Sequence, residues 1–209
     1  MADFSKSSDK NDVGAVGGEA ADSVDERINE QAAFVLRGYI VQAAHEDDPD
    51  VLLSQEDLGG SQSESRDPEV KEIVRNLIQI GDELNRNAEL QYLIDHIQLD
   101  SADLFYVVAE RIFENGINWG RVVALFHFAY KLIYKAVTTN CRDIVRKIMG
   151  WALNFFRRHV SQWIREQGGW ETVQYYFQNL RWHNVRRWHN LAIFVAGVLT
   201  GAMAYWKMT

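Results

Sequence analysis

The placement of the prolines limits the fold of this chain more than any other feature of its sequence. The 209 residues include only two prolines, Pro49 and Pro68. Proline breaks helices because it has no backbone N–H to donate and because its ring clashes with the preceding turn. All of the chain after Pro68 can therefore run as helix without such a break.

Hydrophobic periodicity indicates where the helices lie. A first amphipathic helix is marked by the apolar residues Ile28, Ala32, Val35, Leu36 and Tyr39. Asp67 and Pro68 stand where an N-cap and a first-turn proline would begin a second helix. Further helices are expected around residues 90–94 and at 102–113, 119–137, 144–163 and 170–177. No segment alternates with period two over a useful length, so the sequence predicts an all-α fold.

Three parts of the chain depart from this helical body, residues 24–180. Residues 1–23 are rich in Ser, Asp, Gly and Ala without any period, which predicts a disordered arm. Residues 45–68 are acidic and contain both prolines, which predicts a long flexible loop within the body. Residues 188–206 form a C-terminal apolar tail.

Charge is distributed unevenly along the chain, whose net charge is −7. Residues 1–141 carry 12 Lys and Arg against 26 Asp and Glu, whereas residues 142–209 carry 10 against 3. Basic residues beside a membrane helix favour anionic headgroups by roughly 1 kcal/mol each. Pairing of the basic half with the acidic half of the same chain is the alternative interpretation.

The tail predicts a C-terminal membrane anchor. The 19 residues between Arg187 and Lys207 carry no charged side chain, and a helix of that length spans roughly 28 Å, close to the hydrocarbon thickness. The residues expected to form the membrane helix are Trp188, Leu191, Ile193, Phe194, Val195, Gly197, Val198, Leu199, Gly201, Tyr205 and Trp206. The polar residues His189, Asn190 and Thr200 make it less apolar than a permanent span. We therefore expect that the tail can also fold against the protein; a buried core helix is the alternative.

A second candidate for function is an apolar stripe interrupted by a glycine and an acid. Ile73, Leu77, Ile80 and Leu84 follow one another at intervals of four, three and four, which places them on one helix face. An ordinary core-facing helix explains the stripe but not Gly81-Asp82 within it, because glycine in a helix costs roughly 0.5–1 kcal/mol relative to alanine. Such a glycine indicates the close approach of another backbone, and Asp82 then needs a cationic partner. This pattern is typical of a helix that binds in a groove.

The third candidate is the sequence Asn118-Trp119-Gly120-Arg121 at the start of a strongly apolar helix. An arginine there should be paired or stand at the edge of a groove. Asp82 is the natural partner for it.

Other kinds of chemistry find little support. The six histidines show no metal-binding spacing, and the sequence contains no phosphate loop and no nucleophile elbow. The basic residues near the tail lack the dense positive charge of a nucleic-acid binder. We expect a chain that is not an enzyme, with no cofactor, no metal and no nucleic-acid partner.

These residues carry a family resemblance. Residues 73–84 resemble the third homology motif of the Bcl-2 family, residues 115–125 (NGINWGRVVAL) its first, and residues 163–173 (WIREQGGWETV) its second. The order and spacing of the motifs match as well. Within the family, NWGRVVALF, IMGW and IFVAGVLT are most similar to the pore-forming pro-apoptotic effectors.

The resemblance implies a helical bundle with a central apolar hairpin, residues 119–137 and 144–163, and a C-terminal transmembrane helix. It also implies a surface groove, whose residues here would be Asn118, Trp119, Gly120, Arg121, Phe126 and Trp170. The implied function is a pro-apoptotic regulator, latent in the cytoplasm and active at the mitochondrial outer membrane. Once activated it would insert, dimerise by exchanging residues 73–84 into the groove of a second copy, oligomerise and release cytochrome c.

The implied partners are Bcl-2 family proteins, death-promoting amphipathic helices, a second copy of the chain and mitochondrial membrane lipids. Two alternatives remain open. An anti-apoptotic member of the same family would have the same motifs and would sequester death-promoting helices. A tail-anchored adaptor would bind partners without forming pores.

Overall fold

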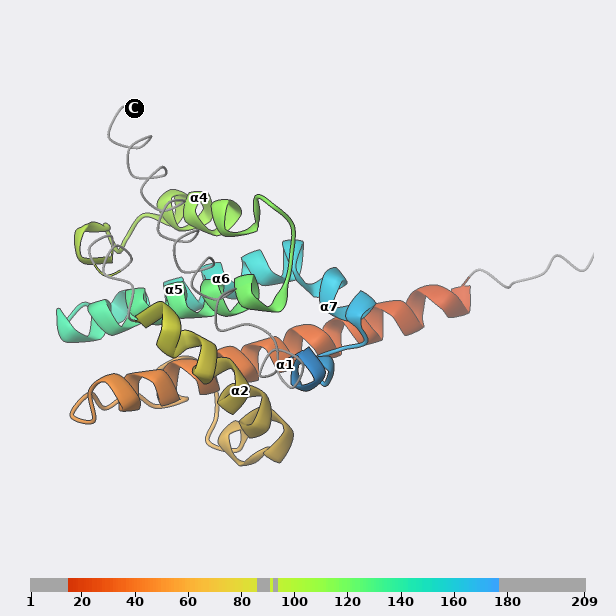
Figure 1. Ribbon diagram of the computed structural model, residues 1–209, viewed down its shortest axis with the longest axis horizontal. Coiled ribbons are helices and arrows are strands. Elements are labelled where there is room, and N and C mark those ends of the chain that lie inside the picture. Colours follow the sequence, from red (N-terminus) through yellow and green to blue (C-terminus); the bar gives the residue numbers. More distant parts are fainter. Residues whose placement is uncertain (1–14, 86–90, 92–93, 177–209) are drawn as a thin grey trace, which may run out of the picture.

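The structure is a computed structural model that describes residues 15–85, 91 and 94–176 (Figure 1). Within these residues there are helices and no strand, as predicted. The α-helices are α1 (Ala15–Asp47), α2 (Pro68–Asn85), α4 (Ala102–Phe113), α5 (Trp119–Thr138), α6 (Val145–His159) and α7 (Ser161–Gln167). Two 3₁₀ turns, η1 (Glu64–Arg66) and η2 (Arg142–Ile144), precede α2 and α6, and residues 172–176 are again helical.

Side-chain caps determine where several helices begin. The Asp67 carboxylate accepts hydrogen bonds from the backbone N–H groups of Glu69 and Val70 at 2.9 and 3.4 Å, so the predicted cap of α2 is confirmed. Ser101 caps α4 in the same way through the N–H of Leu104. These bonds satisfy N–H groups that have no partner within their own helix.

Helix α5 is the centre of the bundle. Of its 20 residues, 15 are buried, on all sides of the helix, as expected of a helix surrounded by others. Figure 1 shows α5 and α6 side by side, with α4 against one side of the pair and the long helix α1 along the other. Helix α2 packs on both α1 and α5. The α5–η2–α6 pair is the apolar hairpin that the sequence predicts.

The second arm of the hairpin is shorter than predicted. Residues 144–163 do not form one helix, because α6 ends at His159 and α7 begins at Ser161. Between them the Val160 backbone lies outside the usual helical geometry, with φ −112° and ψ −35°. The break lets Val160 and Ile164 both reach zero exposure and sets Trp163 edge-on to Trp119. Burial of these side chains outweighs the continuity of the helix.

The N-terminal boundary also differs from the expectation. Helix α1 begins at Ala15, so residues 15–23 are helical although the sequence predicted an arm over 1–23. The segment contains three alanines and Glu19, which favour helix, and it continues a helix already fixed by packing from Ile28 onward. Residues 1–14 lie outside the described residues.

The acidic loop is shorter and more closely held than predicted. Helix α1 runs through Asp47, so the loop spans residues 48–67 and not 45–68. Leu58 is buried in the core at 3 % exposure. Glu64 receives two hydrogen bonds from the guanidinium of Arg37 on α1, at 2.7 and 3.1 Å. These contacts fasten the loop to the side of α1.

Within residues 15–85, 91 and 94–176, no helix combines the length and the apolar character that a membrane span requires. The predicted anchor at 188–206 lies outside the described residues, as does most of the short helix expected around 90–94.

Candidate partner-binding site

The apolar stripe of α2 faces the core of its own molecule. Ile73, Leu77, Ile80 and Leu84 are between 0 and 4 % exposed and belong to the hydrophobic core. In this conformation the stripe is covered, so a partner could bind it only after α2 has turned or moved away from α1 and α5.

The glycine within the stripe is explained by a side chain and not by a backbone. A β-carbon added at Gly81 would overlap the hydroxyl group of Tyr39 on α1, and it would come within 3.1 Å of the ring carbon that carries the hydroxyl. The expectation of a close backbone at this position is therefore wrong for this conformation. Gly81 provides the space that lets the buried Tyr39 reach across α2. The next residue, Asp82, is solvent-exposed.

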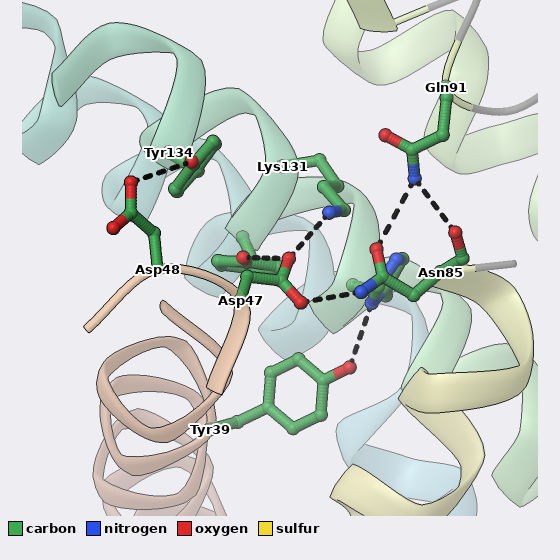
Figure 2. Close-up of polar contacts among 9 residues, drawn as sticks. Tyr39, Asp47, Asp48, Asn85, Gln91, Lys131 and Tyr134 are labelled. Atoms are coloured by element: carbon green, nitrogen blue, oxygen red, sulfur yellow. Dashed lines mark hydrogen bonds and ion pairs between the residues drawn. The ribbon is translucent and has the colours of Figure 1, made fainter. Parts of the chain in front are cut away.

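The Tyr39 hydroxyl also forms a hydrogen bond with a residue of α5. Its oxygen lies 3.0 Å from Nδ1 of His127, and both side chains are buried (Figure 2). Burial, followed by the positive charge of Lys131, lowers the pKa of His127 to about 3, so its imidazole is neutral at physiological pH. The same burial raises the pKa of Tyr39. The neutral pair joins α1 to α5 directly beside Gly81.

Asp47, the last residue of α1, forms a second polar junction. Its side chain is partly exposed to solvent. Its carboxylate accepts hydrogen bonds from Lys131 and Tyr130 on α5, at 2.7 and 2.5 Å, and from Asn85 on α2, at 2.5 Å (Figure 2). Lys131 is itself only 6 % exposed. One carboxylate thus joins the ends of α1 and α2 to the middle of α5.

Opposing effects set the pKa of Asp47. Burial alone would raise it, but the hydrogen bonds from Lys131 and Tyr130, the charge of Lys131 and the hydrogen bond from Asn85 together hold the pKa below its usual value. A carboxyl group whose pKa is lowered by folding stabilises the fold above its unfolded-state pKa, near 4. That contribution is lost as the pH falls through the lower value of the folded state.

We expect Asp47→Asn to lower the free energy of unfolding by about 1.5–3 kcal/mol at pH 7, the usual range for hydrogen bonds to a charged group. The substitution leaves buried Lys131 without its counter-charge. Urea unfolding from pH 7 to pH 3 measures the effect, and the difference from the wild type should shrink below about pH 4. Asp50→Asn, at an exposed position in the adjoining loop, is the matched control. A difference that stays constant down to pH 3 would contradict the role given to the ionised carboxylate.

Four of the six residues predicted for the groove are buried, and three of these form an aromatic cluster. Trp119, Phe126 and Trp170 are at most 3 % exposed. The Trp170 ring lies 5.6 Å from that of Trp119 and 6.1 Å from that of Phe126, and it stacks on Phe156 at 5.7 Å. In this conformation these side chains hold α5, α6 and the turn after α7 together. Their direct contact with a partner stays a prediction.

The other three groove residues lie at the start of α5. The Asn118 side chain accepts a hydrogen bond from the Arg121 backbone N–H at 3.0 Å and so caps the helix. Gly120 is buried. The guanidinium of Arg121 donates to the carbonyl oxygen of Gly116 at 2.6 Å. Contact of Arg121 with Asp82 of a second copy stays a prediction.

Known proteins share both the sequence and the fold. A model of the apoptosis regulator proteins of the Bcl-2 family matches residues 77–170. The apoptosis regulator BAX of Mus musculus is 40 % identical over 195 residues, which cover 91 % of this chain and 94 % of the mouse protein. The chain belongs to the Bcl-2 family. The apoptosis regulator BAX of Homo sapiens is 39 % identical over 190 residues, which cover 87 % of this chain and 90 % of the human protein.

The fold agrees with this membership. The crystal structure of chicken BOK matches 72 % of this chain and 95 % of its own, with a TM-score of 0.58 and 23 % sequence identity. The Bcl-2 family resemblance and the all-helical Bcl-2 fold expected from the three motifs are therefore confirmed. The chain is a Bcl-2 family apoptosis regulator similar to BAX.

The polar junctions were not predicted from the sequence. The sequence predicts Tyr39 only as part of the apolar face of α1, and of the six histidines it indicates only that they lack metal-binding spacing. Each residue is unremarkable within its own helix, and its role depends on a neighbour 88 residues away. Asp47 lies within residues 45–68, for which the sequence predicts a flexible loop. A tyrosine on an apolar stripe and a lysine within a buried helix were the available signals, since both need a polar partner.

Proposed function

We propose that the chain is a latent pro-apoptotic effector that permeabilises the mitochondrial outer membrane after activation and so releases cytochrome c. The observation that carries the proposal is the inward orientation of the α2 stripe. Helix α2 has the composition of a groove-binding helix, yet its four stripe residues lie in the core of its own molecule. A protein of this design is inactive until α2 is released.

Activation then exchanges one set of contacts for another. An amphipathic helix of the death-promoting type, or another Bcl-2 family protein, favours the conformation in which α2 leaves α1 and α5. A ligand can shift such an equilibrium only by binding one conformation more tightly than the other. The released stripe binds in the groove of a second copy, with Asp82 facing Arg121 of the partner molecule. The function is binding and assembly and not catalysis.

The C-terminal segment is the part of the chain that would attach the protein to the membrane. Residues 188–206 have the length and the aromatic ends of a membrane helix, and we propose that they anchor the active form in the outer membrane. In the latent form the same segment lies against the protein, and the chain is cytoplasmic. Helices α5 and α6 carry several Lys and Arg residues, which favours shallow embedding over a two-helix span.

The central test is the exchange of α2. Asp82→Arg places a positive charge opposite Arg121 of the second copy and is the decisive variant. Gly81→Glu adds a charged side chain to the same helix but also overlaps Tyr39 within the molecule, so its result is interpreted only together with a measurement of its stability. Breaking a hydrogen-bonded charge pair at an interface costs about 2–5 kcal/mol, so dimerisation should weaken at least tenfold. Release of dye from liposomes and of cytochrome c from mitochondria, after activation by a death-promoting helical peptide, should fall to the unactivated level.

Glu72→Arg and Gln79→Glu are the matched controls, because both positions lie on the exposed face of the same helix. Asp82 is also exposed, so Asp82→Arg should fold normally, which circular dichroism checks. Full permeabilisation by Asp82→Arg would overturn the exchange step. Protection of cells from death on expression would indicate the survival role, and peptide binding without any leakage would indicate an adaptor.

A further inference from the structure

Helix α6 has an exposed face that carries several positively charged side chains. Its buried side consists of Val145, Ile148, Met149, Ala152, Phe155 and Phe156. Its exposed side carries two pairs of cations, Arg146-Lys147 and Arg157-Arg158, with Gly150 and Asn154 between them. No Asp or Glu occurs anywhere in residues 144–165. We call these four cations the α6 basic face.

The helix itself does not explain the placement of these charges. Cations are favourable in the last turn of a helix, where the macrodipole is negative, and unfavourable in the first turn. Arg157 and Arg158 lie in the last turn of α6. Arg146 and Lys147 lie in the first turn, which contains no acidic residue. The first pair therefore opposes the dipole and calls for a different reason.

Ion pairing within the protein does not explain the placement either. Within the described part of the chain, Lys147, Arg157 and Arg158 take part in no ion pair. The neighbouring helices do carry acids on their exposed sides. Glu26 and Glu30 of α1 line a cavity together with Arg157. Helix α4 carries Asp103 and Glu110, and Glu114 is its C-cap. None of these carboxylates lies within 4 Å of a cation of the α6 basic face.

The two pairs are arranged to meet an extended surface. They are separated by eleven residues, which is about three helical turns and about 16 Å, so both pairs point to the same side. Gly150, midway between them, has no neighbouring atom within 4 Å of the place where a β-carbon would be. No other residue therefore covers the helix surface at Gly150.

One end of this face already contacts the acidic loop of the chain. Arg146 donates a hydrogen bond to the backbone carbonyl of Glu56 in the acidic loop at 3.3 Å. Hydrogen bonds from Ser54 lower the pKa of the neighbouring Asp57, and the charges of Arg142 and Arg146 lower it further. The loop thus brings a carbonyl oxygen and the charge of Asp57 to Arg146 and leaves Lys147 and the second pair open.

We infer that the α6 basic face is a docking surface for a bilayer that contains anionic phospholipids, and that the acidic loop competes with the bilayer for the Arg146 end. A bilayer supplies phosphate groups over a continuous plane, which suits four cations spread over about 16 Å on one side of a helix. The contact would bring the folded protein to the membrane before the tail inserts. It deepens the proposed function by giving the protein its own affinity for the membrane surface.

Vesicle flotation of the full-length protein tests this docking surface without any activator. Wild-type protein should bind phosphatidylcholine vesicles that contain phosphatidylglycerol more tightly than vesicles of phosphatidylcholine alone, and high salt should abolish the difference. Lys147→Glu with Arg158→Glu should weaken binding to the anionic vesicles by at least about thirtyfold, since each basic residue near the surface contributes about a factor of five and the two glutamates add repulsion. Both positions are exposed, so the double variant should fold normally.

Arg66→Glu with Lys71→Glu is the matched control, because it changes the net charge equally at two exposed positions near the start of α2. The inference is overturned if the two double variants bind alike, or if neutral and anionic vesicles bind the wild type equally. If the wild type bound a soluble polyanion such as heparin as tightly as it binds the anionic vesicles, the assignment to a bilayer would be overturned. If the wild type bound anionic vesicles but released no dye after activation, the result would count against the proposed function and not against the α6 basic face.

Discussion

Trp170→Ala should lower the free energy of unfolding by about 3–5 kcal/mol, the range found when a large buried aromatic side chain is truncated. Trp170 is 1 % exposed and touches the rings of Trp119, Phe126 and Phe156. Its removal leaves a cavity between α5 and α6 that rigid helices cannot close. Its indole N–H also donates to the carbonyl oxygen of Ile28 on α1 at 3.2 Å, so α1 loses a contact as well.

Chemical unfolding followed by circular dichroism measures the loss, and Trp170→Phe separates its two parts. Phenylalanine keeps most of the ring contacts and removes the hydrogen bond to Ile28, which is worth about 0.5–1.5 kcal/mol. It should therefore cost much less than alanine. If alanine and phenylalanine destabilise the protein equally, the aromatic cluster is not what holds this region. Any effect of Trp170→Ala on partner binding has to be read against its loss of stability.

Gly81→Ala is expected to destabilise the latent conformation by about 1–3 kcal/mol, as overpacking of a close-packed core does. The direction is opposite to the intrinsic preference of a helix, in which alanine is favoured over glycine by about 0.5–1 kcal/mol. The reason is the Tyr39 hydroxyl, which occupies the place of the added methyl group. Tyr39 cannot retreat easily, because it is fully buried and bonded to His127.

A double-mutant cycle with Tyr39→Phe isolates this contact. Removing the hydroxyl relieves the overlap but leaves the ring carbon 3.1 Å from the added methyl group, so rescue should be partial. The cost of Gly81→Ala should fall by at least 1 kcal/mol in the Tyr39→Phe background, well above the usual deviation from additivity at independent sites. Gln79→Ala, on the exposed face of α2, is the control. Independent, additive effects of the two changes would contradict the close contact.

Local patterns in the sequence were sufficient for most of the fold. The spacing of apolar residues placed α1, α2, α4 and α5, and the residue types at Asp67 and Pro68 placed the start of α2 correctly. Such features depend on neighbours within one or two turns, which the sequence displays directly. The family motifs added the order of the helices and their relation to one another.

Features that depend on distant neighbours were not accessible in this way. The break at Val160 occurs in a stretch with good helical periodicity, and it is decided by the packing of Trp163 on Trp119. Gly81 was recognised as exceptional, but the atom that fills its place belongs to Tyr39, 42 positions earlier in the chain. The groove residues are predicted from a family motif. The motif indicates which residues are expected to contact a partner, but it does not indicate whether they are buried in this conformation.

In the proposed activation, the carboxylate of Asp47 couples the release of α1 to the release of α2. Asp47 binds Lys131 and Tyr130 on α5 and Asn85 on α2 at the same time, so the hydrogen bond to Asn85 is lost whether α1 or α2 moves. The free energy of detaching both helices is therefore smaller than the sum of detaching each one alone. A stimulus that displaces α1 would therefore also weaken the attachment of α2, even if it does not bind α2 itself.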